Sequence, residues 1–557
     1  MRGHQGLPGV LAQGLIPLGV VLLGAVLFAA MFPNPVCPEG LPFVAWVAYV
    51  PVFWLSYRRG LGGSLLWGGL YGYAAYGLFN YWLSVFHPLA GVIVGVIYLV
   101  FFMILFPLLK AAVFLFPRRG YILQVLLWIS FEYLRTQGFL GYPYGITGYS
   151  QWRITPLIQI ADIFGVWGVS LLVVFPAAWL AAAIYGAPWR AWPSRIQAFF
   201  RRERVSAGLW LAALMGTVVY GFTAQVDYSD APTARIALIQ HNTDPWLGGI
   251  AEYRKNYEVL KRLSVEALQG EPKPDLVVWS ETAFVPRIYW HITYRDDPAS
   301  YALVKELMDY LAVQEVPFVI GNDDARKDPA KNPVGDHRVD YNGVLLFDRG
   351  AIAEVYRKLH LVPFTEHFPY EKQFPLIYAA LRNADTHFWE QGDELTVFRV
   401  NGLTFSTPIC FEDTFGYLSR DFVRNGAELI VNLSNDAWSK SLPAQMQHLS
   451  MALFRAVENR RSMVRSTASG QTCGIDPNGV IIAMAEPFEE TQLTVQVPVF
   501  TRDTWYTKYG DLLPRGCVAA AALLLLLRIG SGIIGIIRHI EIKKNLRIDK
   551  DTDSIGK

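Results

Sequence analysis

Residues 403–413 read Leu-Thr-Phe-Ser-Thr-Pro-Ile-Cys-Phe-Glu-Asp, and the interpretation of the fold starts from the cysteine in this stretch. Its first half is rich in β-formers and predicts a short buried strand, and a helix is expected from about Thr414. Cys410 therefore stands at a strand-to-helix turn. The unpaired amides of a helix N-terminus favour the thiolate, which is the nucleophilic form of cysteine. A small buried core residue is the alternative interpretation of a single cysteine in such a stretch.

Two further stretches place charged side chains at strand ends. Residues 275–281, Asp-Leu-Val-Val-Trp-Ser-Glu, predict a strand that ends in Glu281, and residues 341–356 predict a hairpin that delivers Lys358. Each charge alone is typical of a solvated strand end. In the order glutamate, lysine and cysteine, however, they resemble the catalytic set of the nitrilase, or carbon-nitrogen hydrolase, superfamily. The resemblance implies that Glu281 takes the thiol proton, Lys358 stabilises the oxyanion and Cys410 carries an acyl group.

Motifs downstream of the cysteine narrow the resemblance. Asn-Leu-Ser-Asn-Asp-Ala-Trp at 432–438, Gln-His at 447–448 and Phe-Arg-Ala-Val-Glu-Asn-Arg-Arg at 454–461 follow a hydrophobic N-terminal half. Together they are similar to the apolipoprotein N-acyltransferase family, membrane enzymes that add the third acyl chain to bacterial lipoproteins. The resemblance covers nearly the whole chain and implies supporting or substrate-binding roles for five residues: Glu366, Phe411, Glu412, Trp246 and Trp438. The loop spacing before Trp246 departs from the family pattern.

The composition separates a membrane part from a soluble part. Of 557 residues, 52% are hydrophobic and only 17% are charged, which is too apolar for an all-soluble protein. Apolar runs of about 20 residues, the length that crosses a bilayer core, recur up to Phe222, whereas 234–500 has the charge density of a soluble domain. Membrane spans are predicted at 11–32, 41–57, 62–84, 89–116, 121–135, 156–186, 206–226 and 512–537.

The expected organisation has three parts. Residues 1–228 form a transmembrane domain of about seven helices, 229–505 a catalytic domain, and 506–557 a final transmembrane helix with a basic tail. Alternating strands and helices in the middle part indicate an α/β domain. The resemblance makes that domain a nitrilase-like four-layer αββα sandwich, so the fold class is a polytopic α-helical membrane domain plus an extramembrane α/β domain.

Basic residues predict the orientation in the membrane. Arg58-Arg59, Arg118-Arg119, the arginines of 190–204 and the basic tail all fall on one side of the predicted spans. By the positive-inside rule that side is the cytoplasm. The catalytic domain is therefore expected on the periplasmic side of a bacterial inner membrane.

Two carboxylates within the predicted spans, Glu132 and Asp162, are expected to face a partner or a polar cavity. Arg135 is the candidate partner of Glu132.

Other chemistries find no support in the sequence. The chain has no Gly-x-Ser-x-Gly elbow, no phosphate-binding glycine loop and no cysteine or histidine pair with zinc spacing, so no metal or organic cofactor is implied. The histidines are scattered and are expected in loops or in the core. Four cysteines are few for an oxidising compartment, and no disulfide is expected. No basic and aromatic stripe suggests nucleic acid.

The leading hypothesis is a ping-pong acyl transfer. A phospholipid is the acyl donor, a thioester on Cys410 the intermediate, and the α-amino group of a diacylglyceryl-cysteine at a lipoprotein N-terminus the acceptor. We expect a monomer. One alternative keeps the chemistry but lets water resolve the intermediate, as in a membrane-anchored amidase or nitrilase. A second alternative is a non-enzymatic membrane sensor or transporter with a nitrilase-like domain.

Overall fold

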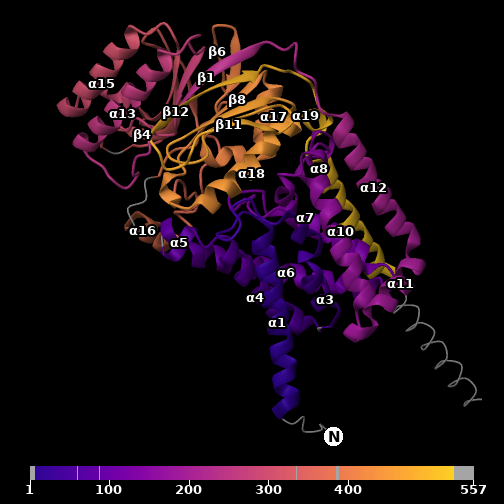
Figure 1. The fold of residues 1–557 in the computed structure, drawn as a ribbon. Helices are drawn as coiled ribbons and strands as arrows, with labels where there is room; N and C mark the ends of the chain where they lie inside the picture. The colour runs from indigo at the N-terminus through magenta and orange to yellow at the C-terminus, as the bar shows by residue number, and fades with distance from the viewer. Residues whose placement is uncertain (1–6, 59, 87, 334, 384–387, 532–557) are drawn as a thin grey trace, which may run out of the picture.

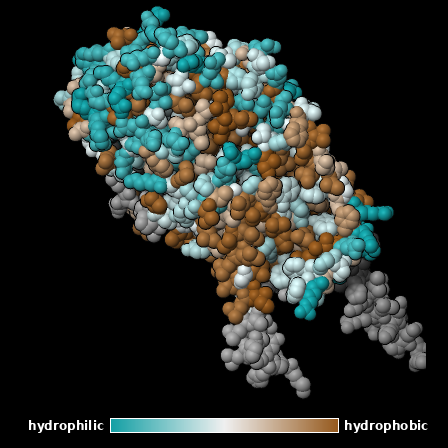
Figure 2. Space-filling model, in the orientation of Figure 1, coloured by the Kyte–Doolittle hydropathy of each residue, from teal (hydrophilic) through white to brown (hydrophobic). Residues whose placement is uncertain are grey.

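The computed structural model describes residues 7–58, 60–86, 88–333, 335–383 and 388–531. A bundle of helices carries a layered α/β body (Figure 1). Apolar side chains cover the helices that project below this body, whereas hydrophilic side chains gather on the body itself (Figure 2). The two parts therefore suit two different solvents, a bilayer and water.

The helical part is built mainly from the first two fifths of the chain, up to Thr223. Its helices are α1 Leu7–Met31, α2 Ala45–Ala48, α3 Val50–Arg58, α4 Leu61–Phe79, α5 Leu83–Phe86, α6 Pro88–Leu115, α7 Gly120–Leu134, α8 Thr155–Ile158, α9 Ala161–Phe164, α10 Val166–Ile184, α11 Trp192–Arg202 and α12 Arg204–Thr223. Among the described residues, five segments are long and apolar enough to cross a membrane: Gly14–Met31, Ala90–Leu115, Val166–Ile184, Arg204–Thr223 and Leu512–Ser531. The chain is thus a membrane protein.

Several expected spans differ from the observed helices. The span expected at 156–186 is divided into α8, α9 and α10. Gly165, with a φ of +63°, separates α9 from α10. The span expected at 121–135 is α7, which has only 15 residues. The predicted end of the last span at 537 and the basic tail lie outside the described residues.

Two six-stranded sheets form the body. The first has the order β12-β1-β2-β3-β4-β5 and the second β11-β10-β9-β8-β7-β6. The strands are β1 Thr233–Gln240, β2 Leu276–Trp279, β3 Phe318–Lys327, β4 Arg338–Asp348, β5 Ala351–Arg357, β6 Val397–Val400, β7 Leu403–Ser406, β8 Leu429–Ser434, β9 Ser462–Thr467, β10 Cys473–Ile475, β11 Ile481–Met484 and β12 Thr491–Pro498. Because β1, β2 and β3 run parallel, as do β7, β8 and β9, each sheet gathers several strand carboxyl ends at one edge.

Helices cover both sheets and complete the four layers. α13 (Ile250–Leu268) and α15 (Pro298–Ala312) pack on the first sheet through a separate apolar core that includes Leu260, Leu303 and Val277. The two sheets face each other, and the Ser466 hydroxyl of β9 donates to the Val278 carbonyl of β2 at 3.0 Å. α17 (Gly416–Arg424) and α18 (Leu442–Asn459) lie beside the second sheet (Figure 1). This arrangement confirms the expected αββα sandwich.

α18 is enclosed on all sides. Every residue from Pro443 to Asn459 is buried, because the helix lies between the second sheet and the helical bundle (Figure 1). The remaining helices are α14 Ile288–Tyr294, α16 Pro375–Asn383 and α19 Trp505–Tyr509.

The basic loops of the helical part gather at the end remote from the sheets. The rings of Tyr57 and Tyr185 lie 5.0 Å apart, and Arg119 Nε lies 3.3 Å from Glu203 Oε2. The segments that carry Arg58, Arg118-Arg119 and the arginines of 190–204 therefore share one end of the bundle, where α11 is seen in Figure 1.

Candidate active site

The three side chains expected to act together meet between the two sheets. Glu281 follows β2, Lys358 follows β5 directly, and Cys410 opens the 3₁₀ turn Cys410–Thr414 after β7. Lys358 Nζ donates to Glu281 Oε1 at 3.3 Å. The Cys410 thiol lies close enough to both residues for their charges to act on its ionisation.

Lys358 is a fully buried cation with two carboxylate partners. Its Nζ donates to Glu366 Oε1 at 2.8 Å as well as to Glu281, and its side chain is 0% exposed. Burial alone would lower the pKa of Lys358, but the charges of Glu366 and Glu281 raise it above its ordinary value. The ammonium therefore stays protonated, as an oxyanion-stabilising group must. The second oxygen of Glu366 accepts from Val362 N at 2.8 Å, and the expected supporting role of Glu366 stays a prediction.

Glu281 is held at both oxygens. Asn342 Nδ2 donates to Oε1 at 2.8 Å, and the backbone N–H of Asn435 donates to Oε2 at 2.9 Å. The carboxylate is oriented by β4, which carries Asn342, and by the turn after β8, which carries Asn435. Sequence reasoning did not identify Asn342, because only the folded sheet places β4 beside the end of β2.

The Cys410 thiol lies in a buried environment. Cys410 is 8% exposed and has a φ of +48°, in the left-handed region. Burial raises the pKa of the thiol well above its ordinary value, the Glu281 charge raises it further, and Lys358 lowers it. The 3₁₀ turn Cys410–Thr414 stands between the thiol and the next helix, α17, which begins at Gly416. The resting thiol is protonated and needs a base.

Glu412 joins the Lys358 loop to the Cys410 turn. The carboxylate is fully buried, and burial raises its pKa to about 7. Its donors, all within 2.7–2.9 Å, are the backbone N–H groups of Ile409, Leu359 and His360 and the hydroxyl of Tyr356. Glu412 therefore fixes the backbone on either side of the site, and Tyr356 is a supporting residue that sequence reasoning missed.

Two of the expected aromatic residues contact the membrane part. The Phe411 ring lies 6.4 Å from the Tyr142 ring, and the Trp438 ring lies 5.9 Å from the Trp82 ring. Trp246 stands on the loop after β1 and is 55% exposed. Its predicted substrate contact stays a prediction.

The carboxylates in the expected spans have found partners. Glu132 Oε1 accepts from the backbone N–H of Thr147 at 3.0 Å, whereas Arg135 donates to the carbonyls of Tyr142 and Tyr144. The predicted Glu132–Arg135 pair is therefore wrong. Asp162 has a partner, as expected, since Arg460 Nη2 of the α/β body lies 2.7 Å from Asp162 Oδ2.

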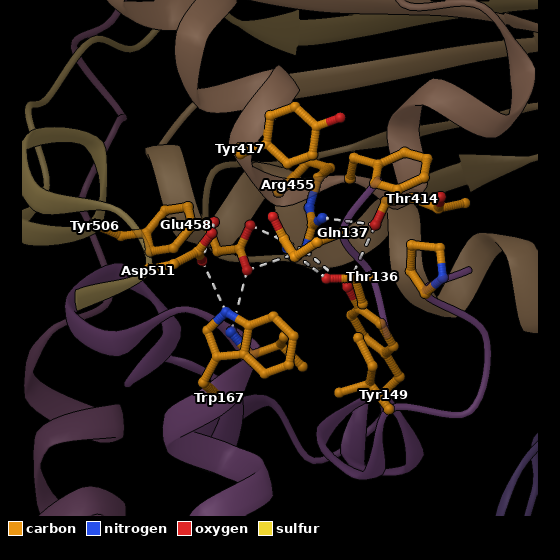
Figure 3. A pocket seen from close by; sticks show the side chains of 15 residues that line it. Thr136, Gln137, Tyr149, Trp167, Thr414, Tyr417, Arg455, Glu458, Tyr506 and Asp511 are labelled. Atoms are coloured by element: carbon orange, nitrogen blue, oxygen red, sulfur yellow. Dashed lines mark hydrogen bonds and ion pairs between the residues drawn. The ribbon is translucent and has the colours of Figure 1, made fainter. Parts of the chain in front are cut away.

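A second polar cluster lies where the Cys410 turn ends. In Figure 3, Arg455 points toward Thr414, and Trp167 of the membrane part points toward Asp511. Arg455 Nη1 donates to the Thr414 carbonyl at 3.0 Å, and Trp167 Nε1 donates to Asp511 at 2.8 Å. The cavity between them holds about 20 Å³, enough for a water molecule and far too little for an acyl chain. The cavity lies at the contact between the two parts of the chain and is not a lipid pocket.

Fold and site together define a carbon-nitrogen hydrolase domain on a membrane base. The Carbon-nitrogen hydrolase family matches residues 235–506, and the Apolipoprotein N-acyltransferase N-terminal domain matches residues 23–179. Apolipoprotein N-acyltransferase 1 of Treponema denticola is 45% identical over 513 residues, which cover 89% of this chain and 93% of that protein. The chain belongs to the apolipoprotein N-acyltransferase family.

Other relatives match this chain over a similar share of its length. Apolipoprotein N-acyltransferase 1 of Treponema pallidum is 45% identical over 92% of this chain and 94% of its own length. Apolipoprotein N-acyltransferase of Geobacter metallireducens is 33% identical over 89% of this chain and 92% of its own length. Both parts of the chain are therefore shared with these proteins. Within the described residues, no group of three or more His, Cys, Asp or Glu is arranged to hold a metal ion.

Proposed function

We propose that this protein transfers an acyl chain from a phospholipid, through a thioester on Cys410, to the α-amino group of the N-terminal diacylglyceryl-cysteine of lipoproteins. The observation that carries the proposal is the buried contact of Lys358 with Glu281 beside the Cys410 thiol, in a chain of this family. The contact of Phe411 with Tyr142 supports a lipid donor, because it sets the thiol next to the membrane part.

The first half-reaction consumes the phospholipid. Glu281 takes the thiol proton, and Cys410 Sγ attacks the ester carbonyl carbon. Lys358 stabilises the oxyanion of the tetrahedral intermediate. The ester C–O bond then breaks, the proton held by Glu281 passes to the leaving oxygen, and a lysophospholipid departs.

The second half-reaction forms the amide. The neutral amine of the acceptor attacks the thioester carbonyl, Lys358 again stabilises the oxyanion, and Glu281 takes a proton from the nitrogen. The C–S bond breaks, and the sulfur leaves and regains a proton. A thioester suits this step because amines attack it more readily than the ester that was consumed.

We place the site on the periplasmic side of the inner membrane. The shared end of the basic loops, remote from the sheets, supports this orientation through the positive-inside rule. We set the limits of the catalytic domain at 229 and 505, since the strands run from Thr233 to Pro498. One chain supplies all of the proposed catalytic groups, so we propose that the monomer is active.

Acyl labelling tests this function. Purified protein mixed with phospholipid that carries a labelled acyl chain should acquire the label on Cys410, and Cys410→Ala should acquire none. Cys517→Ala is the matched control, since it removes a buried thiol from the C-terminal helix and should keep the label. Full labelling of Cys410→Ala would contradict the acyl-enzyme.

A second measurement separates transfer from hydrolysis. The labelled protein is mixed with a diacylglyceryl-cysteine peptide, and the label should move to the peptide amine. Release of the label as free fatty acid, with no labelled peptide, would favour the amidase alternative.

A further inference from the structure

A buried histidine lies directly behind the Cys410 turn. His448 of α18 is 3% exposed. Its Nδ1 lies 2.9 Å from Asp436 Oδ1, and its Nε2 lies 2.7 Å from Asp413 Oδ1 and 3.3 Å from the Cys410 carbonyl oxygen. Because a carboxylate faces each ring nitrogen, both nitrogens must donate, and only the imidazolium can do so. The ring is therefore a buried cation behind the Cys410 turn.

The charges around this ring balance. Arg465 of β9 pairs with Asp413, and its Nη2 lies 3.6 Å from Asp436 Oδ2. Two cations and two carboxylates are thus enclosed together. The membrane part contributes the Tyr144 ring, 6.4 Å from the His448 ring. Burial opposes the charge of His448, but Asp413 and Asp436 raise its pKa to about 9, and Arg465 lowers it. Loss of the imidazolium would leave one net negative charge beside the thiol.

The two carboxylates belong to two turns, one that carries Cys410 and one that orients Glu281. Asp413 lies in the 3₁₀ turn that begins with Cys410. Asp436 follows Asn435, whose backbone N–H orients Glu281. His448 therefore contacts the turn that carries Cys410 with one ring nitrogen. With the other nitrogen it contacts the turn that orients Glu281.

We propose that His448 is a positioning residue, whose imidazolium fixes the Cys410 turn against the Asn435-Asp436 turn and so sets the thiol in reach of Glu281. The inference rests on the proposed function, because it assigns Glu281 the role of base. It predicts that His448 acts on the rate of acylation and leaves phospholipid binding unchanged, since the ring is only 3% exposed behind the turn.

Single-turnover acylation of His448→Gln tests the proposal. Gln is neutral and cannot donate from two opposite ends, so the maximal rate of acylation should fall by at least 10-fold. The phospholipid concentration that gives half of this rate should stay unchanged. The wild-type rate should fall as pH rises through about 9, where the imidazolium loses its proton, and this limb should be absent in His448→Gln. His291→Gln is the matched control, since His291 is also buried beside a carboxylate, 3.2 Å from Asp296, but lies in α14. It should keep the wild-type rate and pH profile.

Two additional measurements keep the outcome decisive. Alkylation of Cys410 by iodoacetamide, followed by mass spectrometry, reports thiol ionisation without phospholipid, and His448→Gln should alkylate more slowly.

If wild type never acquires an acyl group, the proposed function fails, and the alkylation profile still tests His448. If His448→Gln does not fold, Asp436→Asn replaces it, and the high-pH limb should move to lower pH. An unchanged rate and profile in His448→Gln, an equal loss in His291→Gln, or an unmoved limb in Asp436→Asn would overturn the proposal.

Discussion

The Cys410 thiol and the Glu281 carboxylate depend on each other at the level of single residues. Burial keeps the thiol protonated, so the nucleophile forms only when a base removes the proton. The hydrogen bonds of Asn342 and Asn435 fix that base in one orientation. Lys358 offsets the negative charge that the two would otherwise accumulate. A buried site of this kind avoids a permanently reactive thiolate but requires every partner.

Glu281→Gln should separate orientation from proton transfer. The amide keeps the shape of the carboxylate and can still accept from Asn435, but it cannot take the thiol proton. We expect thioester formation to fall by a factor on the order of 10²–10⁴, as for a lost general base. Single-turnover consumption of labelled phospholipid measures this step. Glu315→Gln is the control, since Glu315 is 87% exposed and should keep the wild-type rate. Near wild-type acylation by Glu281→Gln would remove it from the catalytic set.

At the level of elements, local patterns predicted the catalytic strands and missed the connections between them. The strand before Glu281 and the hairpin before Lys358 were expected from their β-formers and turn residues, and they are β2, β4 and β5. The break at Gly165 was missed, because an apolar run of sufficient length reads as one span. The His448 network was missed for a different reason. Its charges come from α18, β9 and two turns, and no local pattern joins them.

α18 also carries a buried carboxylate, Glu458, where the helix contacts the membrane part. Glu458 Oε1 accepts from Arg455 Nη2 at 2.9 Å and from Val166 N at 3.1 Å. Burial raises the pKa of Glu458 from 4.5 to about 7, with Arg455 opposing the shift and Asp511 adding to it. A raised folded pKa means that the stability contributed by the protonated carboxyl is present below about 4.5 and is lost as pH rises through about 7.

Glu458→Gln should remove this dependence on pH. The amide keeps the shape of the protonated carboxyl but does not ionise. The free energy of unfolding of the variant, relative to wild type, should therefore increase by up to about 3 kcal/mol between pH 4.5 and pH 7. Thermal unfolding of both proteins in detergent, at pH values across this window, measures the change. A constant difference between the two proteins would show that Glu458 does not titrate there.

At the level of the whole molecule, the α/β body docks on its membrane base through buried polar contacts. The side-chain amide of Gln447, the residue before His448, donates to the Pro33 carbonyl at 2.9 Å and accepts from Trp82 Nε1 at 3.0 Å. Arg460 Nη2 lies 2.7 Å from Asp162 Oδ2, which is the buried partner expected for that membrane carboxylate. α18 therefore contacts both the Cys410 turn, through His448, and the membrane part, through Gln447.

The orientation of the bundle has a direct consequence for function. If the basic end of the bundle faces the cytoplasm, the α/β body and Cys410 must lie outside, where a lipoprotein N-terminus is exposed after export. A reporter that is active only outside the cytoplasm should therefore work when fused near Ser229, just before β1, and fail when fused near Ser194 in α11. Ser194 lies in a helix with Arg201 and Arg202 in its last turn, at the end of the bundle remote from the sheets (Figure 1). A reporter that is active only in the cytoplasm, fused at the same two sites, is the control and should give the reverse pattern. Activity of the first reporter at Ser194 and not at Ser229 would place the catalytic body in the cytoplasm and remove exported lipoproteins as its acceptor.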